Sequence, residues 1–143
     1  MGTLAQFATN MRKRAAALNN GASQLAVKTA STILTDLVHV TPVDTSQALS
    51  NWQVELDAPV ESKIGPYFPG KQGSTQGVSS DAALAAGLAV LATKKPGQPI
   101  YISNVLPYIG RLNEGSSKQA PAGFVERAIL LARRSTENAK IME

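Results

Sequence analysis

A stripe of apolar residues at spacings of three and four runs through the first 40 residues of the chain. This spacing is typical of an amphipathic helix with one face against a core. Thr3 is a suitable N-cap, and Pro42 ends the helix because the residue before a proline disfavours helical geometry. We therefore predict one helix over residues 3–40, with Gly21 as the site of any bend. Its buried stripe is predicted to contain Leu4, Phe7, Met11, Ala15, Leu18, Ala22, Leu25, Thr29, Ile33 and Leu37.

Two short segments have the pattern of strands. Residues 51–57 alternate apolar and polar side chains, which indicates a half-buried strand, and residues 100–103 are apolar enough for a second one. Between them, residues 58–79 show no period and contain three prolines and four glycines. Irregular segments of this length are usually functional loops or disordered, so a long irregular loop is expected there.

Helices are expected around the second strand. Ser80 is a suitable cap for one helix, a single helical turn is expected near 108–112, and Pro121 fits the first position of a last helix. The order of elements predicts an α+β fold in a single domain, residues 1–143. In this fold the long N-terminal helix, the second helix and the C-terminal helix pack on a short antiparallel or mixed sheet.

The composition excludes several kinds of site. The 143 residues include no cysteine and one histidine, which leaves no disulfide framework, thiolate zinc site or histidine cluster. The longest apolar run is too short to cross a bilayer, and the first basic residues follow the apolar ones rather than precede them as in a signal peptide. We expect no cofactor, no bound metal, no membrane contact and assembly in the cytoplasm.

One segment has the outline of a phosphate-binding loop. Residues 65–71 match its first seven positions, but Gln72 lacks the hydroxyl that would bind magnesium. Pro66 and Pro69 also lack the N–H groups that cradle phosphate. A proline- and glycine-rich surface loop is the favoured interpretation.

The single histidine allows a catalytic alternative. His39 has Asp36 and Asp44 near it in sequence, so a base-plus-carboxylate pair is conceivable. No nucleophile is tied to it by a recognisable pattern, and a histidine near a helix C-terminus interacts favourably with the helix dipole. We therefore expect a chain that is not an enzyme, with no catalytic residues.

Basic side chains cluster at two places, Arg12-Lys13-Arg14 and Arg133-Arg134. Solvated helix faces are the favoured interpretation, and contact with phosphate or with acidic patches of a neighbour is the alternative. The net charge of +4 comes from 14 Lys and Arg against 10 Asp and Glu and is spread along the chain. A dedicated DNA-binding protein more often concentrates a basic stripe, so a small basic DNA-binding accessory protein remains the second hypothesis.

Two segments together resemble a known family. The first is Thr41-Pro42-Val43-Asp44-Thr45-Ser46, followed by Ala48-Leu49-Ser50-Asn51-Trp52. The second is Tyr101-Ile102-Ser103-Asn104, then Pro107-Tyr108-Ile109, Leu112-Asn113-Glu114-Gly115-Ser116-Ser117-Lys118-Gln119-Ala120-Pro121 and Gly123-Phe124. They resemble the tail-completion or neck proteins of tailed bacteriophages and are similar to the minor tail protein Z group of lambdoid phages. That family often has Gly then Arg after the Asp-Thr pair, where this chain has Ser46 and Gln47.

The resemblance implies a structural virion protein at the head–tail junction. Such proteins form homo-oligomeric rings, typically of six copies, that join tail to head and surround the DNA channel. The implied partners are further copies, neighbouring neck, connector, tail-terminator or tail-tube proteins, and DNA that passes without sequence-specific binding.

Two sets of residues follow from these expectations. The turn and anchor residues are Pro42, Asp44, Thr45, Trp52, Pro107, Tyr108, Gly115 and Pro121. The candidate interface residues are Arg12, Lys13, Arg14, Tyr67, Phe68, Lys71, Arg133 and Arg134.

Overall fold

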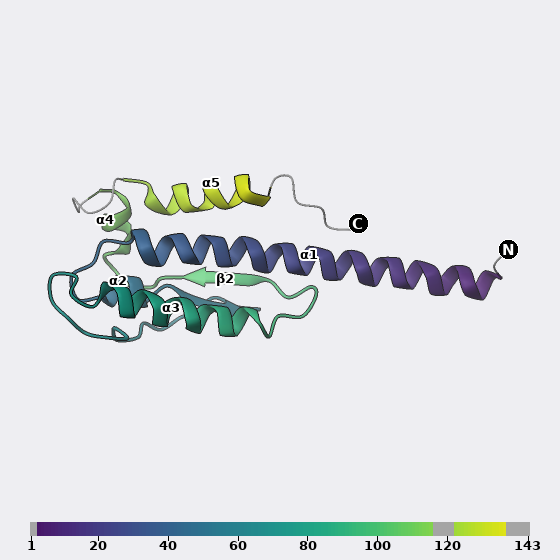
Figure 1. Cartoon of the computed structure of the whole chain (residues 1–143), viewed down its shortest axis with the longest axis horizontal. Helices are drawn as coiled ribbons and strands as arrows, with labels where there is room; N and C mark the ends of the chain where they lie inside the picture. Colours follow the sequence, from purple (N-terminus) through teal and green to yellow (C-terminus); the bar gives the residue numbers. More distant parts are fainter. Residues whose placement is uncertain (1–2, 116–121, 137–143) are drawn as a thin grey trace.

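The computed structural model describes residues 3–115 and 122–136 of the chain. It has the expected α+β fold: a long first helix lies between a two-stranded sheet with its covering helix on one side and the last helix on the other (Figure 1). The elements are α1 Leu4–Val40, α2 Gln47–Ser50, β1 Gln53–Leu56, α3 Gln76–Leu91, β2 Ile100–Ser103, α4 Ile109–Asn113 and α5 Phe124–Thr136. Pro121, the expected start of the last helix, is outside the described residues.

Helix α1 begins and ends as the sequence predicts. The Thr3 hydroxyl accepts the Gln6 backbone N–H at 3.2 Å, and the Gln6 side-chain oxygen accepts the Thr3 N–H at 2.9 Å, which forms a capping box. The helix continues through Gly21 without a break and ends just before Thr41 and Pro42 (Figure 1). The Thr41 N–H still bonds the Leu37 carbonyl at 3.0 Å, so the chain leaves the helix at the proline.

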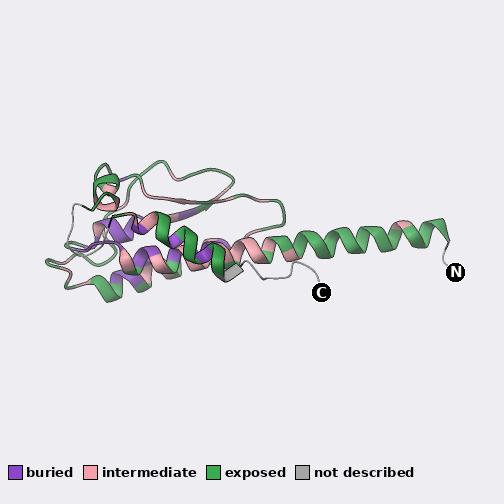
Figure 2. Ribbon diagram, turned by 90° about the horizontal axis from the view of Figure 1, so that it is seen from above, coloured by how far each residue is buried: buried purple, intermediate pink, exposed green. Residues whose placement is uncertain are grey.

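The stripe predicted to be buried is wrong for the first half of α1. Leu4, Phe7, Met11 and Leu18 are 84%, 62%, 49% and 48% exposed, because the other elements lie only along the second half (Figure 2). There the buried residues of α1 are Ala30, Leu34, Leu37 and Val38. Leu37 was predicted as part of the buried stripe and is confirmed, whereas Ala30, Leu34 and Val38 lie on the neighbouring side of the helix. The core therefore uses a face of α1 that overlaps the predicted stripe at Leu37.

The sheet is antiparallel and buries one face. Val54 pairs with Ile102, and both side chains point to the core, while the Glu55–Tyr101 pair faces outward. The alternation predicted for residues 51–57 is therefore confirmed, with β1 itself limited to Gln53–Leu56. Helix α3 packs against β1 and α1, so each inward side chain of the sheet meets a helix.

Helix α3 begins earlier than predicted. It starts at Gln76, so Ser80 is not its cap but a buried residue in its second turn, where its hydroxyl donates to the Val38 carbonyl at 3.0 Å. The irregular segment therefore ends at Thr75 rather than at residue 79. The four-residue helix α2 was not predicted from the sequence, because it is shorter than any detectable helical period.

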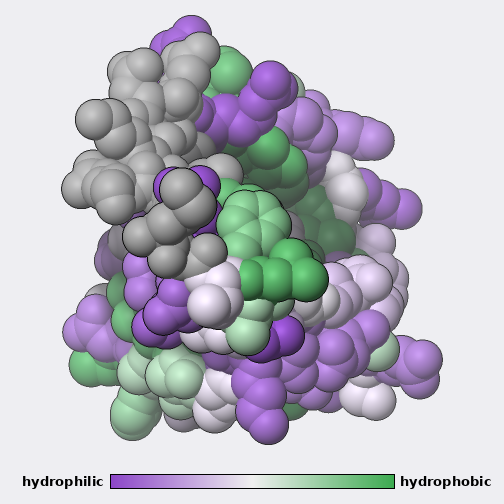
Figure 3. All heavy atoms as spheres, turned by 90° about the vertical axis from the view of Figure 1, so that its right-hand side faces the viewer, coloured by the Kyte–Doolittle hydropathy of each residue, from purple (hydrophilic) through white to green (hydrophobic). Residues whose placement is uncertain are grey.

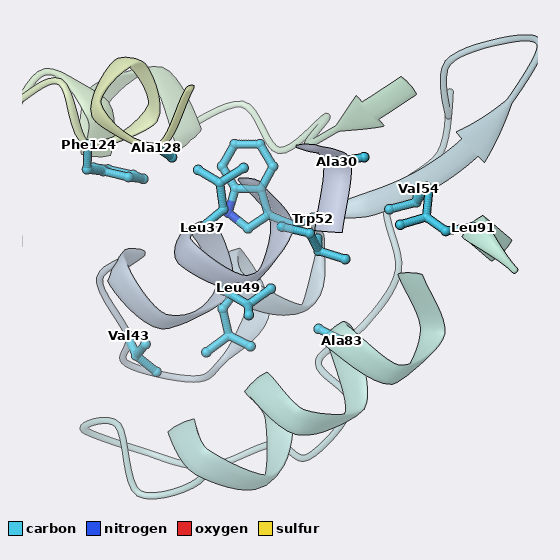
Figure 4. Packing of buried hydrophobic residues seen from close by; sticks show 12 residues of the cluster. Ala30, Leu37, Val43, Leu49, Trp52, Val54, Ala83, Leu91, Phe124 and Ala128 are labelled. Atoms are coloured by element: carbon cyan, nitrogen blue, oxygen red, sulfur yellow. The ribbon is translucent and has the colours of Figure 1, made fainter. Parts of the chain in front are cut away.

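The core joins all the layers (Figure 4). Leu37 of α1, Leu49 of α2, Trp52, Val54 of β1, Ala83 of α3 and Phe124 of α5 belong to one cluster. Phe124, Ala128 and Ala132 are fully buried, so α5 packs on α1 through one stripe of its own. In the described part of the chain, no helix has the length and hydropathy needed to cross a membrane.

A glycine in α3 sets the helix spacing. A Cβ on Gly87 would collide with Leu34 Cδ2 and stand 3.0 Å from Val54 Cγ2, and the Leu34 side chain is fully enclosed and cannot move aside. Gly87→Ala is therefore expected to lower the free energy of unfolding by roughly 1–3 kcal/mol, measured by urea denaturation.

Gly77, on the same helix, is the matched control. A Cβ there meets nothing within 4 Å, so Gly77→Ala should leave stability unchanged or raise it by up to about 1 kcal/mol. Equal effects of the two substitutions would contradict the close contact at Gly87.

Candidate assembly surface

The turn after α1 is built around Thr41 and Trp52. The Trp52 indole N–H donates to the Thr41 hydroxyl at 2.8 Å, and that hydroxyl donates to the Leu37 carbonyl. Pro42 and Val43 are buried beside them. The indole ring thus fills the core while its polar edge is satisfied at the helix end, which fixes the direction in which the chain leaves α1.

Asp44 acts at long range rather than within its own turn. Its carboxylate accepts the Gln72 N–H at 2.6 Å, and its backbone carbonyl accepts the Gly73 N–H at 2.8 Å. Asp44 was predicted as a residue of the turn itself, but these two bonds tie segment 57–75 to the end of α1. Within the described residues, the exposed Thr45 side chain forms no hydrogen bond.

Ser46 has a conformation that suits glycine. Its φ is 69°, in the left-handed region that most residues avoid. Its hydroxyl lies 2.8 Å from that of Thr75, whose own hydroxyl donates to the Phe68 carbonyl. The hydrogen bond to Thr75 holds the serine in this strained position and joins the turn to the end of the irregular segment.

Segment 57–75 is held by buried polar side chains. The Asn51 amide accepts the Ile64 N–H and donates to the Ile64 carbonyl, both at 2.8 Å, and it also bonds the Gln47 carbonyl. Asn51 is fully buried, and its side chain pairs with both backbone polar groups of Ile64, as a neighbouring strand would. The loop is therefore ordered by its hydrogen bonds and not by an apolar core of its own.

Two serines fix the aromatic part of this segment. The buried Ser50 hydroxyl accepts the Tyr67 N–H, and the buried Ser79 hydroxyl accepts the Phe68 N–H, each at 3.1 Å. The Tyr67 and Phe68 side chains are exposed. Because their N–H groups are already bonded, the segment cannot present them to phosphate, which agrees with the surface-loop interpretation. It instead displays two aromatic side chains, with exposed Lys71 close behind them in sequence.

The second family-like segment lies against the first. The Asn104 side chain donates to the Ala48 carbonyl at 2.9 Å. Tyr108 and Leu112 line a cleft of about 280 Å³ together with the α1–α2 turn. Partial burial in this cleft raises the pKa of the Tyr108 phenol. Pro107 itself is exposed, and the buried anchor of this segment is its neighbour Leu106, which sequence reasoning missed.

Asn113 connects this corner to α5. Its side-chain oxygen accepts the Val125 N–H at 2.9 Å, and its amide donates to both Glu126 carboxylate oxygens at 3.0 Å. Its carbonyl accepts the Gly123 N–H. Gly115 follows with a φ of 96°, the left-handed conformation expected for it. Asn113 had no sequence signal beyond its place in the family-like segment.

The structure separates the two carboxylates that the catalytic alternative invoked. His39 lies on an exposed face of α1 with its Nδ1 2.6 Å from the Thr35 carbonyl, and it lines a groove with Asp36 and Leu131. Asp44 lines the different cleft beside Tyr108. The described residues hold no group of three or more His, Cys, Asp or Glu side chains that could bind a metal.

The two basic clusters are both exposed. Arg12, Lys13 and Arg14 lie on the uncovered half of α1, and Arg133 and Arg134 lie in the last turn of α5. The exposed residues Ile129, Leu130 and Leu131 precede the second cluster, so α5 also presents apolar surface to the outside.

No family model, no curated protein and no solved structure matches this chain.

Removal of the Asn51 amide should release the loop. Asn51→Ala leaves the part-buried N–H and carbonyl of Ile64 unpaired. We therefore expect the free energy of unfolding, measured by urea denaturation, to fall by about 1–3 kcal/mol. Limited proteolysis should also cut faster within residues 57–75. The control is Gln53→Ala, which removes an exposed hydrogen bond to the Ser62 carbonyl and should change the free energy of unfolding by no more than roughly 0.5 kcal/mol. Similar losses for both variants would show that Asn51 has no special role.

The Asn113 amide should control the titration of Glu126. Its hydrogen bonds are the main cause of the lowered pKa of Glu126. Asn113→Ala is expected to raise that pKa toward its ordinary value, as measured by carboxyl ¹³C NMR. Because the folded-state pKa is lowered, the associated stability is present at neutral pH and is lost as pH falls through the folded pKa. Asn104→Ala, which does not touch Glu126, should leave the titration unchanged.

Proposed function

We propose that this chain is a structural subunit of a bacteriophage neck. Copies of it form a ring, of six subunits by the family resemblance, that completes the tail at the head–tail junction and surrounds the DNA channel. The proposal makes it a virion protein without catalytic activity, assembled in the bacterial cytoplasm. Its partners are other copies and neighbouring neck, connector, tail-terminator or tail-tube proteins, and DNA passes through the channel without sequence-specific recognition.

One observation carries this proposal: the two family-like segments form a single corner of the fold. They lie about 50 residues apart in sequence, yet Asn104 bonds Ala48, and Tyr108 and Leu112 line one cleft with the α1–α2 turn. A resemblance that arose by chance in two separate segments has no reason to converge on one place. Ser46 adds support, because its φ of 69° is the conformation of the glycine that the family often has there.

The exposed surfaces also suit a subunit of an assembly. An apolar stripe on the first half of α1, an exposed aromatic pair and apolar side chains on α5 are all exposed in the single chain. Contiguous apolar surface of this kind marks interaction sites. A ring needs two different surfaces on each subunit, one for each neighbour.

A DNA-binding accessory protein is the second candidate. The observation in its favour is that residues 3–35 contain four basic side chains and no acidic one. Phosphate contacts by Arg12, Lys13 and Arg14 would give affinity that falls steeply with salt.

The test uses the phage that encodes the chain. Without this protein, filled heads and finished tails should accumulate unjoined in electron micrographs, and the wild-type chain supplied in trans should restore complete particles. Antibody against the chain should label the neck of intact virions. Absence of the chain from purified virions would overturn the proposal. A mobility shift of duplex DNA, lost with salt and in the Arg12→Ala, Lys13→Ala, Arg14→Ala triple variant, would then support the second candidate.

A further inference from the structure

The first half of α1 is a projecting helix with one apolar side. We call residues 4–22 the arm; its stripe of Leu4, Phe7, Met11, Ala15, Leu18 and Ala22 lies on one face and is exposed throughout. Figure 3, seen from the free end, shows hydrophobic side chains gathered on one part of this end among polar ones. A helix of this length is marginal in water by itself, and Asn19, Asn20 and Gly21 weaken its base. A partner that covered the stripe would therefore give the arm both burial and helical stability.

An open groove lies where the arm joins the rest of the fold. It has a volume of about 550 Å³ and runs between α1 and the start of β2. We call it the body groove; its apolar lining includes Ala22, Ala26, Ala30, Ile33, Ile100 and Ile102. The small side chains on α1 leave room for larger ones, and the large residues of the arm are of the size that would fill it.

The arm cannot reach the body groove of its own chain. Both lie along the same unbroken helix, and Ala22 belongs to each of them (Figure 1). The helix leads the arm directly away from the groove, so a fold-back would require breaking α1. The apolar arm can therefore fill an apolar body groove only on a second copy of the chain.

Charge favours this occupant over a pairing of two arms. The arm carries Arg12, Lys13 and Arg14 and no acid, so two arms aligned side by side would bring like charges together. The groove has an acid at its edge: the Asp57 carboxylate accepts a hydrogen bond at 3.1 Å from Gln98, which lines the groove. Lys94 lines the same groove and remains a cation there, with its ammonium donating to Ser23 and to the Lys95 carbonyl.

The acids are separated from the basic arm along the sequence. Residues 36–62 contain five Asp or Glu and no Lys or Arg, and Glu55 and Asp57 on this stretch are exposed. Of these acids Asp57 is the one next to the groove, whereas Asp36 and Asp44 line other clefts. A membrane surface would attract the basic arm as well, but it would leave the groove unfilled.

We propose that the arm of one copy docks in the body groove of a second copy, with Leu4, Phe7 and Met11 buried and one basic side chain of the Arg12–Arg14 cluster facing Asp57. This contact does not depend on the proposed function, although its head-to-tail repetition is what would close a ring. It names the arm and the body groove as the two surfaces that the proposed ring would use, and it can be tested on purified protein without phage particles.

The absence of cysteine makes crosslinking selective. One full-length chain carries Phe7→Cys in the arm stripe and a second, tagged chain carries Ala26→Cys in the groove. Mixed and treated with a short thiol crosslinker, they should give a heterodimer joined between the two positions. The matched control is Ala16→Cys with Ala26→Cys, because Ala16 is exposed on the opposite side of the arm and should not crosslink. Equal crosslinking from both arm positions, or Phe7-to-Phe7 products alone, would overturn the proposal.

The oligomeric state provides a second, independent readout. Analytical ultracentrifugation of the wild-type chain should show association at high concentration that Phe7→Glu abolishes. Ala16→Glu adds the same charge to the other face and should leave association unchanged. A wild-type chain that stays monomeric at every concentration overturns the arm-in-groove contact, including the case in which it binds vesicles of anionic lipid or DNA instead. That result leaves the neck proposal standing, since virion localisation tests it separately.

Discussion

The close approach of α3 to α1 at Gly87 is the contact on which the rest of the fold depends. Without a side chain there, Leu34 and Val54 meet the helix directly, and β1 and β2 can close over the same core. Trp52 then seals the end of this core and bonds Thr41 at the end of α1. The layers are thus fixed at one end of the long helix, and none of the other described elements covers its first half.

Polar side chains then hold in place the segment that apolar packing does not order. Asn51, Ser50 and Ser79 are buried, yet they bond the backbone of segment 57–75 and hold it over the α1–α2 corner. Such bonds are costly to leave unmade, so they specify one loop conformation although the loop contributes little to the core. The backbone that carries the exposed Tyr67 and Phe68 side chains is therefore held in one place.

The sequence predicted those features that local patterns determine. Pro42 marked the end of α1, and alternation around Val54 marked the sheet. It could not show which half of α1 is covered, because the Leu4–Leu18 stripe has the same period as a buried one. Ser80 was mistaken for a cap because a serine that caps a helix and one that bonds a distant carbonyl look alike in sequence. The Asn51–Ile64 and Asn113–Glu126 pairs depend on tertiary proximity, which no local spacing reports.

The continuity of α1 has a mechanical consequence. Because one helix forms both the core and the arm, the arm acts as a lever about 28 Å long whose direction is set inside the fold. A change of about 10° at Gly21 would displace its tip sideways by roughly 5 Å. In an assembly built through the arm, the three residues of low helix propensity at the base of this lever would thus influence the curvature.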